Sequence, residues 1–107
     1  MILKYSFRNV CVFAEGQIDR SPTGTGVSGR LALHVQRGEV NLGERIVAES
    51  IIGSSFVGRA VDRTTSGGVD AVIPEIEGTA AVTGRCEFLV DPHDPWADGF
   101  LLAQQTE

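Results

Sequence analysis

The run Asp19-Arg20-Ser21-Pro22-Thr23-Gly24-Thr25-Gly26 constrains this chain more than any other feature, because it places a glycine-rich turn directly before an amphipathic segment. A strand-like stretch, Val10–Ala14, precedes the run, and Val27–Arg37 follows it with helical spacing. A helix that begins among glycines offers unpaired backbone N–H groups and the positive end of its dipole, which together can hold a carboxylate or phosphate. The run therefore predicts a small-anion site at a helix start.

The same glycines allow two other interpretations. Gly24, Gly26 and Gly29 have the spacing of a dinucleotide-binding fingerprint. That fold needs a second parallel strand after the helix, whereas the sequence beyond Gly38 is typical of short antiparallel strands. The simpler alternative is a turn that merely starts a helix.

The thirteen glycines divide the rest of the chain into short segments. Alternating apolar residues bounded by glycine predict strands. These strands are Arg45–Ile52, Ser55–Asp62, Val69–Ile76 and Thr79–Val90, with a turn at Gly53-Ser54 and a break at 64–68. Gly38 is expected to end the helix in a left-handed conformation.

The predicted helix carries Val27, Leu31 and Val35 on one face, and Ala32 and Leu33 widen its apolar surface. A helix that is apolar on most sides is expected to be enclosed. With 107 residues, of which 42% are hydrophobic, the chain can bury one modest core as a single domain.

Composition excludes several functional classes. The formal charge is −5 and basic residues do not cluster, which argues against nucleic acid as a partner. No apolar run approaches the roughly 20 residues that span a bilayer, so no membrane partner is expected. Asp91-Pro92-His93-Asp94 has metal-ligand residue types without a second cluster, and no metal site is predicted.

We expect structural roles for both cysteines and for two of the aromatic residues. Cys11 and Cys86 are too far apart in the sequence for a disulfide framework and are expected to be small buried apolar residues, which fits a cytoplasmic protein. Trp96 and Phe100 are expected to pin the C-terminal segment onto the sheet.

The run Asp19–Gly26 resembles the second active-site motif of the proline racemase family, which also contains 4-hydroxyproline epimerases and trans-3-hydroxy-L-proline dehydratases. The resemblance covers about Arg8 to Leu102, and further segments follow in family order. They are Arg30–Leu33, Glu49–Gly53, Ile73–Glu75, Asp91-Pro92 and Gly99-Phe100.

The resemblance implies an α+β fold: a lobe like those of diaminopimelate epimerase, with an antiparallel β-sheet or barrel wrapped around a central helix. Residues 1–107 would form the C-terminal lobe of such an enzyme. The family's first motif, Met-Cys-Gly-His, supplies a thiol base from another lobe and has no match in this sequence. The start, residues 1–7, is atypical of the family and suggests a truncation, although a divergent first strand explains it equally well.

Thr23 occupies the position where racemases and epimerases carry cysteine. Stereoinversion needs a thiol on each face of the substrate Cα, and a hydroxyl is too weak an acid to replace a thiol of pKa about 8.5. Threonine at this position marks the dehydratase branch, which removes the Cα proton of trans-3-hydroxy-L-proline and expels its 3-hydroxyl. The product implied is Δ1-pyrroline-2-carboxylate.

Site roles follow from the same resemblance. Asp19 would bind the ring ammonium, and the backbone N–H groups of Gly24, Thr25 and Gly26 would hold the carboxylate. Thr23 would face the reacting centre opposite the thiol. On the residues alone, Asp19 is equally a turn acid and Thr23 a helix-cap hydroxyl.

The resemblance implies a reaction without a cofactor, whether pyridoxal, a metal or a nucleotide. The implied partners are a proline or hydroxyproline substrate and the lobe that carries Met-Cys-Gly-His, with a homodimer also open. The isolated chain would be inactive. The alternatives are a non-catalytic remnant or association module, and a proline racemase or 4-hydroxyproline epimerase-like protein.

Overall fold

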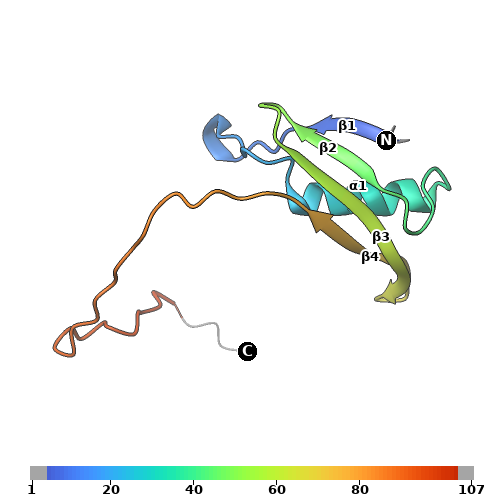
Figure 1. The fold of residues 1–107 in the computed structure, drawn as a ribbon. Coiled ribbons are helices and arrows are strands. Elements are labelled where there is room, and N and C mark those ends of the chain that lie inside the picture. Colours follow the sequence, from blue (N-terminus) through green and yellow to red (C-terminus); the bar gives the residue numbers. More distant parts are fainter. Residues whose placement is uncertain (1–4, 104–107) are drawn as a thin grey trace.

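The computed structural model describes residues 5–103, in which one four-stranded sheet packs against one α-helix (Figure 1). The sheet order, β1-β2-β3-β4, follows the sequence order. The elements are β1 (Tyr5–Asn9), a 3₁₀ turn (Ala14–Gly16), α1 (Gly24–Gln36), β2 (Ile46–Ser50), β3 (Ser55–Ser66) and β4 (Val69–Glu77). The α+β class is therefore confirmed.

The sheet is mixed rather than purely antiparallel. β2, β3 and β4 form antiparallel hairpins that turn at Gly53 and at Gly67-Gly68, where positive φ angles suit glycine. β1 and β2 are parallel, with Tyr5 opposite Ile46 and Asn9 opposite Ser50. A parallel pair needs a long crossover, and α1 supplies it. The expectation that only antiparallel pairing would follow Gly38 is thus wrong for β2.

The core lies between α1 and one face of the sheet. Val27, Leu31 and Val35 are buried, as their spacing predicts, and pack with Ile46 and Ala60. A Cβ atom on Gly58 would lie 3.3 Å from Val27 Cγ1 and 3.2 Å from Ile76 Cδ1, so the glycine lets the helix approach β3 closely.

Leu33 is 41% exposed on the other side of the helix, so the predicted full enclosure of α1 is wrong within the described residues. The end of the helix agrees with the prediction. Gly38 has φ +71° and its N–H donates to the Val35 carbonyl, which terminates the helix in a left-handed turn.

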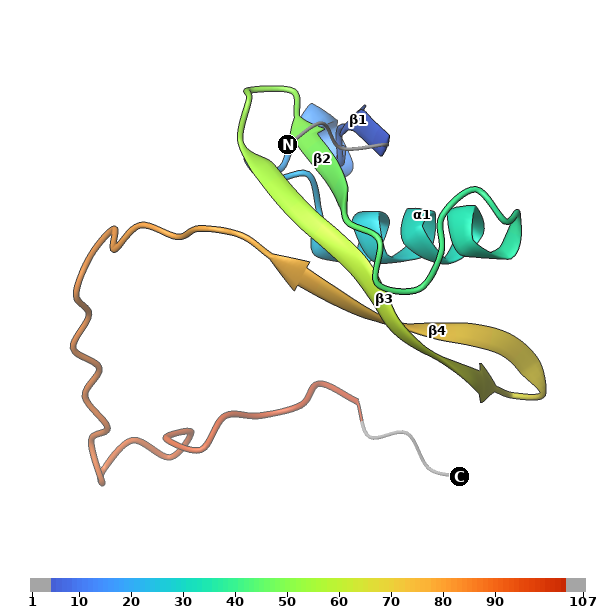
Figure 2. The ribbon, with the colours of Figure 1, turned by 45° about the vertical axis from the view of Figure 1, so that its right-hand side comes forward.

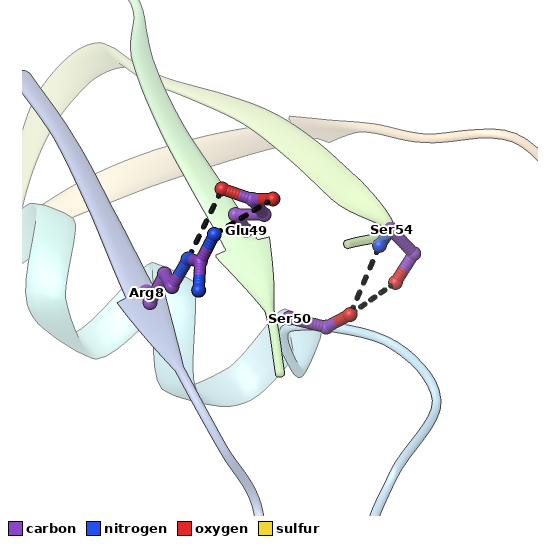
Figure 3. Close-up of polar contacts among 4 residues, drawn as sticks. All are labelled: Arg8, Glu49, Ser50 and Ser54. Atoms are coloured by element: carbon purple, nitrogen blue, oxygen red, sulfur yellow. Dashed lines mark hydrogen bonds and ion pairs between the residues drawn. The ribbon is translucent and has the colours of Figure 1, made fainter. Parts of the chain in front are cut away.

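Ion pairs cover the sheet face that points away from α1. Arg8 Nε lies 3.3 Å from Glu49 Oε2 and joins β1 to β2 (Figure 3). Arg59 Nε lies 2.7 Å from Glu75 Oε1 and joins β3 to β4. The hydrogen bond from Arg59 lowers the pKa of Glu75 below its ordinary value, and the same bond raises the pKa of Arg59. The same face also carries the paired valines Val47 and Val57, which are partly exposed, so it combines exposed ion pairs with a small apolar area.

Residues 78–103 run away from the sheet without a helix or strand (Figure 2). The prediction of a strand over Thr79–Val90 is therefore wrong, because a strand needs a neighbour and β4 pairs only with β3 in the part of the chain described. Cys86 is exposed, and Trp96 and Phe100 are 62% and 69% exposed, so these residues do not have their predicted buried roles. The radius of gyration is 19.5 Å, against about 13 Å for a compact domain of 100 residues.

The predicted strand Val10–Ala14 is also absent. Only Val12 pairs, in an isolated bridge to Ile18, before the 3₁₀ turn begins. The nearest strand is β1, which includes residues 5–7 of the N-terminal segment that is atypical of the family. Residues 1–4 of that segment lie outside the described residues. No helix between residues 5 and 103 is long and apolar enough to cross a membrane.

Candidate active site

A hollow of about 290 Å³ lies where the end of β1 meets the start of α1. Because β1 and β2 are parallel and α1 connects them, the carboxyl ends of both strands and the N-terminus of the helix share one edge of the sheet. In sheets with parallel strands, ligands bind at this edge. The residues that line the hollow are Asn9, Val10, Cys11, Pro22, Thr23, Gly26 and Arg30.

Thr23 occupies the N-cap position of α1 in a strained conformation. Its φ and ψ angles are 73° and 115°, which a β-branched residue rarely adopts and which cost on the order of 1–3 kcal/mol. Its Oγ1 is buried and has no hydrogen-bond partner among the described residues, and it makes no capping bond. The helix-cap interpretation of Thr23 is therefore wrong. Its buried hydroxyl, beside the hollow, still needs a hydrogen-bond partner.

The first turn of α1 presents free donors. The first N–H group that bonds backward is that of Val27, which donates to the Thr23 carbonyl at 2.9 Å. The N–H groups of Gly24, Thr25 and Gly26 have no acceptor within residues 5–103. Their dipoles and that of the helix favour an anion at this end, where the glycine run places the small-anion site that we expect.

Asp19 shapes the loop before the helix. Its Oδ1 accepts the Ser21 N–H at 2.8 Å, and Ser21 Oγ accepts the Thr23 N–H at 3.0 Å. The turn-acid interpretation of Asp19 is therefore correct for Oδ1. Its Oδ2 accepts no bond in the described chain, so this oxygen is open to a cationic group. Asp19 does not itself line the hollow that contains Thr23 and Gly26.

Arg30 lines the hollow, although no role in the site was predicted for it from the sequence. Its Nη1 donates to Asn9 Oδ1 at 3.1 Å, and its guanidinium carbon lies 3.9 Å from the centre of the Phe7 ring. Residues four apart share one face of a helix, so the spacing of Gly26 and Arg30 was the available signal. Arg30 adds positive charge to a wall that already carries the helix start.

The hollow holds one thiol, that of Cys11, which is partly buried. No group of three or more His, Cys, Asp or Glu side chains in the described chain could hold a metal ion, and this includes the 91–94 segment. The hollow therefore presents backbone donors, one strained threonine, one thiol and one arginine, and Asp19 lies in the adjoining loop.

Comparison with known proteins gives a consistent result. The sequence model of the family "Proline racemase" matches residues 3–101. The chain is 52% identical over 95 residues to trans-3-hydroxy-L-proline dehydratase of Colwellia psychrerythraea, covering 89% of this chain and 27% of that protein. It is 50% identical over 94 residues to 3-hydroxyproline 2-epimerase of Burkholderia multivorans, covering 88% of this chain and 28% of that protein.

A solved relative shares the fold. The crystal structure of a hydroxyproline epimerase from Agrobacterium vitis, with bound trans-4-hydroxy-L-proline, aligns with a TM-score of 0.71 and 40% identity. The alignment covers 89% of this chain and 27% of the solved chain. The chain thus spans little more than a quarter of the length of the relatives it matches.

Proposed function

The chain belongs to the proline racemase family, and we propose that it forms one lobe of a trans-3-hydroxy-L-proline dehydratase. In this reaction a base removes the Cα proton, the C3–O bond breaks, and the leaving hydroxide takes the proton from the protonated base and departs as water. The resulting enamine tautomerises to Δ1-pyrroline-2-carboxylate. The observation that carries the proposal is Thr23, a residue that cannot act as the second thiol, placed with a buried unsatisfied hydroxyl at the helix start.

The proposed roles use groups that the structure leaves unengaged. The N–H groups of Gly24, Thr25 and Gly26 hold the substrate carboxylate, whose charge grows as the proton leaves. Asp19 Oδ2 binds the ring ammonium. Thr23 Oγ1 donates to a water at the reacting centre or to the departing hydroxyl, which removes the cost of its burial.

The base is a thiol of the Met-Cys-Gly-His motif, carried by a separate lobe that closes over this site. Exposed apolar side chains support the proposal of a partner lobe. Val82, Phe88 and Leu89 are at least 86% exposed, and large apolar side chains left exposed in one segment can mark an interaction surface. The reaction needs no cofactor, and the compartment we propose is the cytoplasm.

The test is proton NMR of the chain in deuterated water, alone and with a polypeptide that carries Met-Cys-Gly-His. We expect elimination from trans-3-hydroxy-L-proline only with both parts present, and no Cα exchange in L-proline or trans-4-hydroxy-L-proline. Exchange without elimination would transfer the assignment to the epimerase class. An unchanged spectrum with both parts present would favour a non-catalytic module.

The epimerase alternative has its own support, the 50% identity to a 3-hydroxyproline 2-epimerase. It requires a second acid other than Thr23. Among the described cysteines, Cys11 is the candidate for this acid, because it lines the same hollow as Thr23. A Cys11→Ser variant that loses Cα exchange would favour this alternative.

A further inference from the structure

A hydrogen bond ties the active-site loop to a distant hairpin. Ser54, in the turn between β2 and β3, donates its hydroxyl proton to the Arg20 carbonyl, 34 residues away in sequence. Arg20 lies between Asp19 and Thr23. The side chains of Asp19 and Ser21 make bonds that span two residues, and the Asp19 N–H donates to the Cys11 carbonyl, so these bonds shape the loop without attaching it to the sheet.

Ser54 is itself oriented by Ser50 at the end of β2 (Figure 3). Ser50 Oγ accepts the Ser54 N–H at 3.1 Å, and the two hydroxyl oxygens are 2.7 Å apart. The single proton of the Ser54 hydroxyl is used on Arg20, so Ser50 must donate to Ser54 Oγ. The result is a directed chain from Ser50 to Ser54 to the loop.

Burial makes this chain specific. Ser50 is polar and only 1% exposed, so its hydroxyl must be satisfied by protein groups. Ser54 supplies both hydrogen bonds of this hydroxyl. The backbone N–H of Ser50 also donates to the Ser54 carbonyl at 2.7 Å. Hydrogen bonds in series strengthen one another, and this chain ends on the loop.

Thr23 needs such a support. A strained backbone conformation persists only when its surroundings over-determine it. We infer that Ser54, held by Ser50, is a positioning residue that keeps Thr23 in its strained conformation above the helix start. The inference rests on the proposed function for its catalytic meaning, but the anchoring can be measured without substrate.

The experiment is amide hydrogen exchange on the 107-residue chain and three variants. Ser54→Ala removes the tie, and Ser54→Thr keeps a hydroxyl. Ser55→Ala is the matched control, because Ser55 is an exposed neighbouring serine whose side chain makes no hydrogen bond in the described chain. The amides of Ser21 and Thr23 report on the loop, and the amide of Leu31 reports on the core.

We expect Ser54→Ala to accelerate exchange at Ser21 and Thr23 about fivefold to tenfold, the effect of one net hydrogen bond. Exchange at Leu31 should accelerate less, by the cost of leaving the Ser50 hydroxyl without its acceptor. Ser55→Ala and Ser54→Thr should match the parent chain. Equal rates at Thr23 in Ser54→Ala and Ser55→Ala would overturn the inference. Acceleration at Leu31 by the same factor would also overturn it, because it would show global rather than local loosening.

A measurement of ligand affinity tests whether the anchoring of the loop matters for function. Titration with L-proline, followed at the Thr23 amide, should give a Kd about fivefold to tenfold higher for Ser54→Ala than for Ser55→Ala. Faster exchange with an unchanged Kd would refute the positioning role. Absence of any shift in the parent chain would count against the proposed function, and the exchange rates alone would then decide the anchoring.

Discussion

Replacement of Gly26 by alanine should stabilise the protein and weaken its ligand binding at the same time. Gly26 is the third residue of α1 and has no positive φ, so alanine fits the backbone. The added Cβ would lie 3.5 Å from Thr23 Cβ and 3.7 Å from Thr23 Cγ2, which are ordinary contacts. Nothing in the folded state opposes the change.

The two effects have different origins. Alanine restricts the unfolded chain, which raises the free energy of unfolding by about 0.4–1 kcal/mol and Tm by roughly 2–8 °C. The methyl group, however, projects into the hollow between Thr23 and Arg30. Filling a fitted space costs about 1–3 kcal/mol, so the Kd for L-proline should rise roughly tenfold or more.

The assays are thermal unfolding by circular dichroism and NMR titration with L-proline. Gly29→Ala is the matched control: it lies in the same helix, its Cβ would meet nothing within 4 Å, and it does not line the hollow. It should raise Tm without changing Kd. A lower Tm for Gly26→Ala, or a Kd equal to that of Gly29→Ala, would refute the placement of the ligand beside Gly26.

Three further results are expected. Gly58→Ala should lower the free energy of unfolding by about 1–3 kcal/mol in urea, because its Cβ would crowd Val27 and Ile76; an unchanged midpoint would contradict the close packing. Arg59→Gln should raise the pKa of Glu75 toward 4.5 in carboxyl NMR titration. Since Glu75 has a lowered pKa when folded, the pair's stabilisation is present above its unfolded pKa and fades as pH falls through the folded value, and an unshifted titration would refute the pairing. Val82→Lys with Phe88→Lys should reduce binding of a hydrophobic dye, because both side chains are at least 86% exposed; equal fluorescence would assign the dye to another surface.

Local patterns predicted the parts of the fold that depend on local interactions. Val27, Leu31 and Val35 could be assigned to the core because helical periodicity is fixed by neighbouring residues. The hairpin turns at Gly53 and Gly67 followed from glycine between alternating strands. The anion-favouring helix start followed from the glycine run, and its N–H groups are unengaged.

Long-range pairing could not be predicted in this way. β1 becomes a strand because β2 lies beside it after a helical crossover, which leaves no local signal near Tyr5. Thr79–Val90 has the alternation of a strand but no neighbour among the described residues, so it stays extended. The positive φ of Thr23 and the bond from Ser54 to Arg20 likewise depend on contacts that no local pattern encodes.

The position of the exposed segment at the end of the described chain affects folding during synthesis. The sheet and helix end at Glu77, and residues 78–103 leave the ribosome afterwards, within about 1–5 seconds at usual elongation rates. Small domains fold in microseconds to seconds, so α1 can bury its apolar face on the sheet before Phe88 and Leu89 emerge. The order of translation therefore lets α1 dock on the sheet before this exposed apolar segment is available.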